Sequence, residues 1–565
     1  MSNGEAAKPW LQWYPREVPA NLTYPEEPLY ALLEYAADQY GERTATIFFG
    51  ARLTYRQLRE EARRLAAGLI RLGLRKGDRV AVMMANCPQA VIAYFGVLMA
   101  GGVVVMVNPL YTERELRYQL DDSGARILIG LDLVYPKVKG LGLEHLILTE
   151  MPAYMSIPTR WIAPLKLKPP KVAWGAGVQR WAEVLDVKPL PAPIPVDPSE
   201  DLALLQYTGA TTGKPKGCML THRNLMANVY QIGAWLYQRS PADPVRVLVG
   251  LPIFHVYGMT TAMNFAIHMA GEMTLQPRFE PREALKLIQK YKVQIFPGAP
   301  TMYVGINHVP GVEKMDLSSI DACISGAAPL PLEVQQTFER LTHGRLCEGY
   351  GLSEASPVTH ANPVWATRKE GSIGLPWPDT DVRIIDSETG QDVAPGEVGE
   401  MLVRGPQVMK GYWNNPEATA GALRDGWLYT GDMARMDEDG FFYIADRKKD
   451  LIIAGGLNIY PREVEDVLFM HPAVKQAAVI GVPDEYRGES VKAFIVLKEP
   501  PFGDKGVAAT QAELDQHCRA NLASYKIPRH YEFREALPMT LVGKVLRRVL
   551  VEEEAAKRKA MQGVS

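Results

Sequence analysis

Residues 207–217 (YTGATTGKPKG) form a glycine- and threonine-rich stretch with two lysines, and these residue types bind phosphate. Glycines let backbone N–H groups turn toward an anion, while hydroxyl and ammonium groups add donors and positive charge. The stretch is not a Walker A loop, because its first two glycines enclose three residues and proline follows Lys214. It comes just after the apolar run Leu202–Leu205. The pattern therefore predicts a loop that holds nucleotide phosphates, with a polar surface loop as the alternative.

Five further motifs follow in the chain: YGLSE at 350–354, YTGD at 429–432, DRKKD at 446–450, GGLNIYP at 455–461, and GK at 543–544 before Arg547. Together and in this order they resemble the adenylate-forming superfamily, which includes acyl-CoA synthetases, the adenylation domains of peptide synthetases and firefly-type luciferases. The resemblance spans nearly the whole chain and is greatest to the bacterial long-chain fatty-acid–CoA ligases.

The resemblance implies that each part of ATP meets its own set of residues. The β- and γ-phosphates are expected at Thr208, Thr211, Thr212, Gly213 and Lys216. The adenosine is expected at Gly326, Ala327, Tyr350, Asp432 and Arg447. Mg²⁺, a hard cation that prefers oxygen ligands, is expected at Thr208 and Glu354. Ser353 is expected to donate a hydrogen bond to the α-phosphate. The loop departs from the family's usual Ser-Gly-Thr-Thr-Gly at 209–210, which removes one hydroxyl.

Lys544 is the residue expected to drive the first step, with Glu354 and Ser353 as the other catalytic residues. By resemblance it reaches from a small C-terminal domain and bridges the substrate carboxylate and the α-phosphate. Two anions must meet in this step, and a flexible ammonium concentrates positive charge on the developing transition state. A lone lysine in a Gly-Lys turn is more often a solvated surface charge, so the other motifs carry the assignment.

The second step, attack by the CoA thiol, requires different surroundings. Family members rotate the small domain about a residue two positions after the ribose arginine, which is Lys449 in this sequence. This rotation would bring Gly455 and Gly456 against the site, where glycines allow close approach to the pantetheine arm. A tight turn is the alternative role of this glycine pair, and both roles are compatible.

The composition of the 565 residues is that of an ordinary globular protein, 47% hydrophobic and 22% charged. The formal net charge of −2 gives no reason to expect nucleic acid as a partner, since that requires a concentrated basic surface. The five cysteines form no CxxC pair, so we expect reduced thiols in a cytoplasmic protein. The first residues lack the apolar core of a signal peptide, and secretion is not expected.

Apolar runs alternate with amphipathic segments, which predicts βα units that feed a largely parallel sheet. Strands are expected at Arg79–Met84, Val103–Val107, Arg246–Leu251, Gln294–Pro297 and Ala322–Ser325. Ala90–Val107 is almost continuously apolar, but Gly101-Gly102 divides it, so we expect a buried helix and a strand in place of a membrane span.

Residues 371–443 change to short alternating pieces, such as Asp381–Asp386 and Gly399–Arg404, which predict an antiparallel or barrel-like subdomain. The charged stretch 446–450 predicts a hinge and a domain boundary. With the resemblance, we expect an α/β fold. Its large N-terminal domain, residues 1–446, has two layered α/β subdomains plus a distorted β-barrel. Its small mobile α+β domain, residues 447–565, ends in a helix at Val545–Met561.

Residues 151–198 are proline-rich and carry three tryptophans. All five charges between Glu150 and Glu183 are basic. Basic side chains interleaved with tryptophan suit an anionic bilayer interface, so residues 156–181 are expected to contact the inner face of a membrane. A surface loop that covers a hydrophobic edge fits the same composition, and the sequence does not separate the two.

The acyl pocket is expected near Ile253–Met259 and Ser325–Ala327. No aspartate lies in the first of these stretches to pair with a substrate ammonium, and an unpaired buried ammonium is costly, which argues against an amino acid. His255 either positions the carboxylate or is a hydrogen-bonded core residue.

The resemblance implies ATP-dependent conversion of a fatty acid, of long chain, to acyl-AMP and then acyl-CoA, with release of AMP and pyrophosphate. Medium-chain or aryl acids are the alternative substrates, and transfer of the acyl group to a carrier protein is an alternative second step. A non-catalytic membrane-associated acyl-binding protein is the rival of another class. The partners expected are fatty acid, ATP, CoA and Mg²⁺, and relatives commonly form homodimers.

Overall fold

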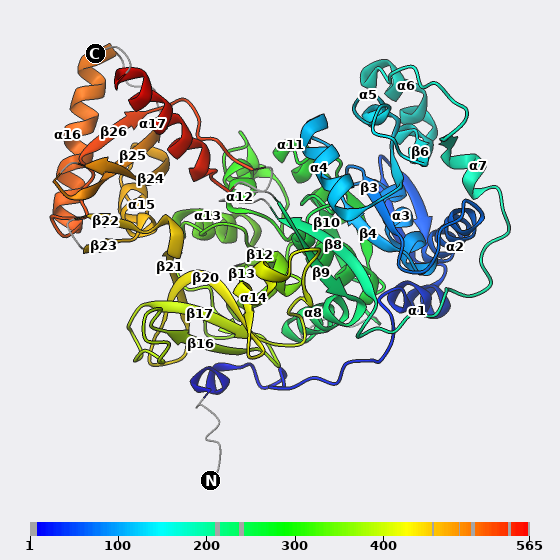
Figure 1. The fold of residues 1–565 in the computed structure, drawn as a ribbon, viewed down its shortest axis with the longest axis horizontal. Helices are drawn as coiled ribbons and strands as arrows, with labels where there is room; N and C mark the ends of the chain where they lie inside the picture. The colour runs from blue at the N-terminus through cyan, green and yellow to red at the C-terminus, as the bar shows by residue number, and fades with distance from the viewer. Residues whose placement is uncertain are drawn as a thin grey trace, which may run out of the picture.

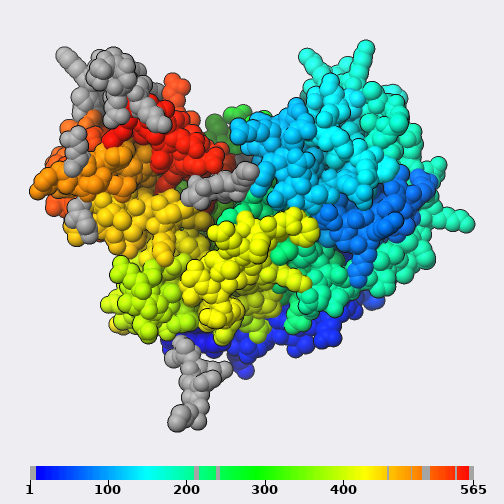
Figure 2. Space-filling view, in the orientation of Figure 1, coloured from blue at the N-terminus to red at the C-terminus, as the bar shows by residue number. Residues whose placement is uncertain are grey.

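The computed structural model describes residues 8–208, 215–236, 242–454, 457–484, 486–498, 503–540 and 544–562. They form a large lobe and a small lobe, and the small lobe is built by the residues from Ile452 onward (Figure 1). Figure 2 shows the small lobe, in orange and red, seated against the yellow part of the large lobe. The fold class is α/β, as the sequence predicts.

An eight-stranded sheet forms one layer of the large lobe. Its strands from one edge to the other are β18 (Gly411–Tyr412), β9 (Lys216–Thr221), β8 (Leu202–Thr208), β4 (Val103–Met106), β3 (Arg79–Met83), β5 (Ile127–Leu131), β6 (His145–Thr149) and β7 (Val178–Arg180). The pairs from β8 to β7 are parallel, whereas β9 is antiparallel to both of its neighbours. The strands predicted at Arg79–Met84 and Val103–Val107 are confirmed.

A second layer starts with β2 (Ala51–Thr54), β1 (Thr44–Phe48), β11 (Glu272–Leu275) and β10 (Arg246–Val249). It continues with β12 (Ala322–Ser325), β13 (Arg345–Gly351), β14 (Val358–Ala361) and β15 (Leu375–Pro376). The strand predicted at Gln294–Pro297 is wrong: only Ile295 pairs, through isolated bridges to Val247 and Ala322. Pro297 has no N–H to donate, which limits a ladder at this point.

Helix α3 (Pro88–Met99) is buried on every side, because all of its residues are buried. It contacts α2, β3 and β4, and a helix that is apolar all round belongs inside a protein core. Gly101, with φ of 74°, then turns the chain into β4. The apolar run at 90–107 is therefore a core helix, a turn and a strand, as predicted. Within the described ranges, no helix is both long and apolar enough to cross a bilayer.

The other helices of the large lobe cover the sheets (Figure 1). They are α1 (Ala31–Tyr40), α2 (Tyr55–Arg71), α4 (Glu113–Ser123), α5 (Tyr135–Val138), α6 (Ile157–Leu167), α7 (Trp181–Leu185), α8 (His222–Trp235), α9 (Val256–Gly258), α10 (Phe265–His268), α11 (Pro281–Tyr291), α12 (Pro300–Asn307), α13 (Leu332–Thr342) and α14 (Pro416–Ala422). Three begin at a threonine whose side chain accepts a hydrogen bond from the third residue of the helix: Thr54, Thr112 and Thr221. Such capping boxes satisfy N–H groups that would otherwise lack partners.

An antiparallel sheet follows where the sequence pattern shortens. It contains β16 (Asp381–Ile385), β17 (Gly399–Arg404), β20 (Trp427–Met436) and β19 (Leu423–Arg424), with β21 (Phe442–Arg447) also paired to β20. The strands expected at Asp381–Asp386 and Gly399–Arg404 are confirmed.

The small lobe has its own sheet, with β23 (Leu457–Ile459), β22 (Ile452–Ala454), β25 (Gly488–Leu497) and β24 (Val474–Asp484), and with β26 (His530–Phe533) parallel to β25. Helices α15 (Pro461–Phe469), α16 (Gly503–Asn521) and α17 (Arg547–Gln562) accompany it. Its buried residues form cores of their own. The helix predicted at Val545–Met561 corresponds to α17. The boundary at 446/447 stays a prediction.

Predicted site residues lie at the carboxyl ends of parallel strands. Thr208 ends β8, Gly326 follows β12, and Tyr350 is the penultimate residue of β13. Ligands of open α/β sheets bind outside these strand ends, so the two layers present their loops to one region.

Phe95 tests the core around α3. It is fully buried, and Phe95→Ala should lower the free energy of unfolding of this lobe by about 3–5 kcal/mol, because it leaves a cavity. Urea unfolding followed by tryptophan fluorescence measures the change. Leu110, 64% exposed, provides the control: Leu110→Ala should change stability by less than about 0.5 kcal/mol. Equal midpoints for both variants would contradict the placement of α3.

Candidate active site

Asp432 and Arg447 face each other across the β20–β21 ladder. Arg447 Nε lies 2.7 Å from Asp432 Oδ1, and the Tyr350 hydroxyl donates to Asp432 Oδ2. Asp432 is buried, and a buried carboxylate requires such partners. Burial and the charge of Asp432 raise the pKa of Tyr350 well above its usual value, so its hydroxyl stays a donor. The structure thus brings together three of the predicted adenosine residues.

Gly351 explains how Glu354 is held in place. A Cβ on Gly351 would lie 2.2 Å from the Pro357 carbonyl oxygen, so only glycine allows β13 to pass this close. The short 3₁₀ turn η6 (Ser353–Ala355) follows and carries Ser353 and Glu354. The Tyr412 hydroxyl donates to Glu354 Oε1 at 2.8 Å.

The phosphate loop is only partly described. Thr208 and Lys216 pair with each other at the end of the β8–β9 hairpin next to the connecting loop. The predicted residues Thr211, Thr212 and Gly213 lie outside the described residues, as do Gly455 and Gly456. Lys216 Nζ lies 4.8 Å from the centre of the Tyr412 ring. Lys216 and Glu354, predicted for phosphate and metal, therefore share one tyrosine.

Lys544 extends from the small lobe toward the adenosine residues of the large lobe. Its backbone forms a tight pair with Thr540: Thr540 N–H donates to the Lys544 carbonyl at 2.8 Å, and Lys544 N–H donates to Thr540 Oγ1 at 3.0 Å. Burial, followed by the positive charge of Arg447, lowers the pKa of Lys544 to about 8. Asp432 acts in the opposite direction. The predicted catalytic lysine therefore lies within electrostatic range of Arg447 and Asp432, the pair predicted to bind the ribose.

His255 lies near the same lysine. Burial, and then the charge of Lys544, lowers the pKa of His255 to about 4, so its imidazole is neutral at pH 7. Its Nδ1 accepts from the Tyr257 N–H at 3.3 Å and caps α9. Of the two roles predicted for His255, this hydrogen bond supports the structural one, while the charge of Lys544 places it near the predicted catalytic lysine.

Gly326 and Ala327 are predicted to line the side of the adenine opposite Tyr350. Both follow strand β12. A Cβ on Gly326 would lie 3.0 Å from the ring of Tyr257, whose hydroxyl donates to the Ile324 carbonyl at 2.8 Å. Ala327 has φ of 73°, in the left-handed region. The glycine motif is thus packed directly on the stretch predicted to line the acyl pocket.

A small apolar cavity lies close to this stretch, but none of the residues that line it belongs to 253–259 or 325–327, so the position of the acyl pocket stays a prediction. It has a volume of about 20 Å³ and is lined by Ile232, Leu236, Thr261, Ile295, Pro297, Ala322, Ile324 and Trp377. Thr261 comes from the π-helical turn η4 (Met259–Asn264), a wide turn that often marks functional sites. A volume of this size holds about one water molecule, so an acyl chain requires it to open.

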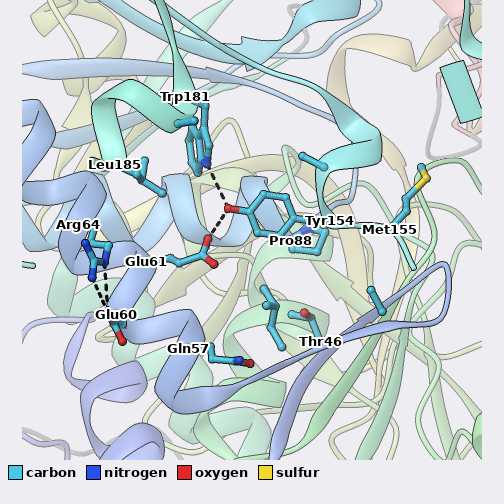
Figure 3. Close-up of a pocket in the computed structure, with 14 residues that line it drawn as sticks. Thr46, Gln57, Glu60, Glu61, Arg64, Pro88, Tyr154, Met155, Trp181 and Leu185 are labelled. Carbon is cyan, nitrogen blue, oxygen red and sulfur yellow. Dashed lines mark hydrogen bonds and ion pairs between the residues drawn. The ribbon is translucent and has the colours of Figure 1, made fainter. Parts of the chain in front are cut away.

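A larger cavity, of about 640 Å³, lies elsewhere in the large lobe (Figure 3). Its walls come from α2, α7 and the segment before α6, and Figure 3 shows Tyr154 between Glu61 and Trp181. Trp181 Nε1 donates to the Tyr154 hydroxyl oxygen at 3.1 Å, and the Tyr154 hydroxyl donates to Glu61. None of the predicted site residues lines this cavity.

Lys449, the predicted hinge residue, lies between two residues that form ion pairs, one with each lobe. Lys448 Nζ lies 2.9 Å from Glu400 Oε2 on β17 of the large lobe. Asp450 Oδ2 lies 3.4 Å from Arg547 Nη1, and Arg547 also contacts Glu465 at 2.6 Å in the small lobe. Lys449 lies between these ion pairs and is exposed.

Sequence reasoning missed Tyr412 and Arg547 as site residues. Arg547 also contacts Asp446 Oδ1 at 3.2 Å, so it braces the segment that carries Lys544 against the hinge. Its position three residues after Lys544 was the available signal. Tyr412 lies in no motif, and nothing in its surroundings in the sequence indicates its contact with Glu354.

Comparison with known proteins identifies the class. The family model for AMP-binding enzymes matches residues 33–413, and that for the AMP-binding enzyme C-terminal domain matches residues 463–544. The chain belongs to the AMP-binding enzyme family.

Two curated relatives cover the chain almost completely. It is 53% identical to a long-chain-fatty-acid–CoA ligase of Bacillus subtilis (strain 168) over 97% of this chain and 99% of the relative. It is 40% identical to a protein of the same name from Salmonella typhimurium (strain LT2), again over 97% and 99%. Among solved structures, an anthranilate CoA ligase in complex with anthranoyl-AMP has a TM-score of 0.85 at 27% identity, covering 95% of this chain and 99% of that one.

The pKa of Lys544 leads to a prediction for pH. The kcat/KM for acid-dependent pyrophosphate exchange reports groups of the free enzyme, and the ammonium form of Lys544 is the one that stabilises anions. This kcat/KM should therefore fall as pH rises through about 8, roughly tenfold per pH unit, whereas an ordinary lysine titrates near pH 10.4. Exposed Lys475 in the same lobe is the control, since Lys475→Ala should keep the same profile. A profile that stays flat to pH 10 would contradict the shift.

Proposed function

We propose that this protein activates a fatty acid, of long chain, with ATP to form acyl-AMP and then acyl-CoA, releasing pyrophosphate and AMP. The observation that carries the proposal is the position of Lys544, which comes from the small lobe and lies beside Arg447 and Asp432 of the large lobe. The names of the relatives, long-chain-fatty-acid–CoA ligase, support the substrate class.

In the first step the carboxylate oxygen attacks the α-phosphorus and pyrophosphate leaves. Repulsion between the two anions must be offset by fixed positive charge, because phosphoryl chemistry asks for little else from the protein. The surroundings of Lys544 disfavour its charged ammonium form. The stabilisation that this charge gives is therefore greatest when the carboxylate and the α-phosphate meet beside it. Asp432 and Arg447 hold the ribose, and Tyr350 packs on the adenine.

The residues near Glu354 fit Mg²⁺. The cation is usually held by one or two carboxylates together with substrate phosphates, and Glu354 offers one carboxylate oriented by Tyr412. Thr208 would add a hydroxyl and Lys216 would meet the departing phosphates, with Thr211, Thr212 and Gly213 beside them. Bound Mg²⁺ would neutralise phosphate charge. Ser353 would donate to the α-phosphate.

In the second step the CoA thiol attacks the acyl carbonyl and AMP leaves. Lys544 occupies the face of the site that the thiol needs, so the small lobe must turn about Lys449. The ion pairs on either side of this residue, Lys448 to Glu400 and Asp450 to Arg547, belong to different lobes and support rotation at Lys449. The contact of Arg547 with Asp446 spans Lys449 and would have to break in the turn. The turn would present Gly455 and Gly456 to the pantetheine arm.

An aryl or medium-chain acid is the second candidate substrate. The name of one relative supports it: a feruloyl-CoA synthase of Amycolatopsis is 38% identical over 89% of this chain. AMP formation with CoA from a panel of acids from acetate to stearate plus benzoate tests both candidates. AMP release without any carrier protein excludes carrier loading, and no pyrophosphate exchange with any acid would overturn the proposal.

The proposal also covers the location of the enzyme in the cell, its membrane contact and its oligomeric state. It places the protein in the cytoplasm, with peripheral contact to the inner face of the membrane through residues 156–181, and it allows a homodimer. The basic, tryptophan-bearing composition of that segment supports the contact.

Lys544→Ala separates the two steps. It should reduce acid-dependent pyrophosphate exchange at least about hundredfold, because a charge aimed at the transition state is lost. It should still convert supplied acyl-AMP and CoA to thioester at near the normal rate, since the lysine has left by then. The exposed Lys475→Ala is the matched control. Loss of both half-reactions in a protein with normal unfolding would contradict the division of labour.

Lys449→Pro tests the rotation. Proline fixes φ near −65°, so the variant should keep pyrophosphate exchange and lose thioester formation from acyl-AMP. Lys449→Ala removes the same side chain without restricting the backbone and should retain both activities. Normal overall turnover by the proline variant would show that rotation at this residue is not required.

A further inference from the structure

Glu348 is a buried acidic residue of β13 to which the reaction proposed above assigns no part. It is 7% exposed, and it pairs with Ser325 of the neighbouring strand β12. Because side chains alternate along a strand, Glu348 lies on the same face of β13 as Tyr350, the residue predicted to pack on the adenine. A carboxylate buried in this position needs a charged or hydrogen-bonding partner.

The charge that balances Glu348 comes from the other lobe. Arg462 of α15 lies with Nη2 3.7 Å from Glu348 Oε1, and its side chain is only 13% exposed. The Arg462 N–H donates to Asp446 Oδ2 at 2.7 Å, which fixes the first turn of α15 beside the hinge segment. In the part of the chain that the structure describes, Arg462 Nε is buried without a hydrogen-bond partner. The guanidinium is therefore enclosed between the lobes, with Glu348 as its counter-charge in the large lobe.

Rotation of the small lobe about Lys449 would separate this pair, because α15 turns with the small lobe and β13 stays with the large one. Breaking a buried ion pair is unfavourable, since each charge that stays buried is left uncompensated. Arg462 and Glu348 therefore favour the orientation seen in the structure, in which Lys544 lies near Asp432.

We propose, on the basis of the two half-reactions proposed above, that Glu348 and Arg462 are positioning residues that hold the lobes in the orientation for adenylate formation. They contact each other outside the segment 446–450 that links the lobes, so their separation opposes the turn toward thioester formation. Both residues act through the position of Lys544 in this scheme.

The pair also responds to pH. The charged groups that face Glu348 are Arg462 and Asp466, both from α15. Burial raises the pKa of Glu348 to about 7, and Asp466 adds to the rise, whereas Arg462 and the Leu330 N–H lower this pKa. The carboxylate form that attracts Arg462 is therefore present above pH 7 and is lost as pH falls below it. Since Arg462 lowers the pKa, acid favours separation of the pair as long as Glu348 stays buried.

Distances between spin labels test the orientation directly. The five cysteines are buried, so nitroxides can be attached at Leu110→Cys in the large lobe and Met470→Cys in the small lobe, whose native side chains are 64% and 60% exposed. Pulsed electron paramagnetic resonance of the full-length protein without ligand should show one main distance at about pH 8 and a growing second distance toward about pH 6. Glu348→Gln should remove this dependence on pH.

Arg462→Gln should populate the second distance at every pH and lower the kcat of acid-dependent pyrophosphate exchange about tenfold, while thioester formation from supplied acyl-AMP is retained. The double variant Glu348→Gln/Arg462→Gln leaves no buried charge unpaired, so it should recover much of the exchange activity. Such recovery distinguishes loss of the ion pair from damage to the fold.

Arg519→Gln is the matched control, because Arg519 is an exposed arginine of the same lobe that pairs within its own helix. It should change neither the distances nor the two half-reactions. Unaltered distances and normal pyrophosphate exchange in Arg462→Gln would overturn the inference and leave the proposed function standing. Absence of exchange in the unaltered protein would instead count against the proposed function.

Discussion

Positive charge brought together from two lobes is the constraint on which this site depends. Arg447 and Lys544 lie close enough for the arginine to oppose protonation of the lysine, and Asp432 offsets this only in part. Each cation is carried by a different lobe, so bringing the lobes together costs electrostatic free energy until negative groups arrive. In the proposed reaction, ATP and a carboxylate supply those groups.

The scaffold reaches this arrangement through close backbone packing. A side chain at Gly351 would collide with Pro357, and one at Gly326 would collide with Tyr257. Gly351 ends β13 and Gly326 follows β12, and the carboxyl ends of both strands point toward the predicted nucleotide site. Asp432 is buried at the centre, and its two oxygens are committed to Arg447 and Tyr350. These two partners fix the orientation of its carboxylate.

Much of this was predictable, because local patterns carry it. The β3 and β4 strands, the buried helix between them and the antiparallel strands β16 and β17 follow from runs of apolar residues and turn signals. The expected strand at Gln294–Pro297 did not form beyond Ile295. The pattern of apolar residues indicates which residues are buried. It does not indicate which backbone N–H groups can pair, and Pro297 has none.

Long-range contacts account for what the sequence could not predict. Tyr412 is 58 residues from Glu354, and Arg547 is 101 residues from Asp446. No motif joins these partners, since they meet only after the sheets have assembled. The ion pairs on either side of Lys449 are also long-range contacts, because Glu400 and Arg547 come from different lobes.

Tyr412 also separates two charged residues of the site. Its ring faces the ammonium of Lys216 and its hydroxyl faces the carboxylate of Glu354. A salt bridge between Lys216 and Glu354 would neutralise both charges, and an incoming nucleotide would first have to break it. With Tyr412 contacting both, the cation and the anion remain available for the phosphate and the metal that we propose they bind.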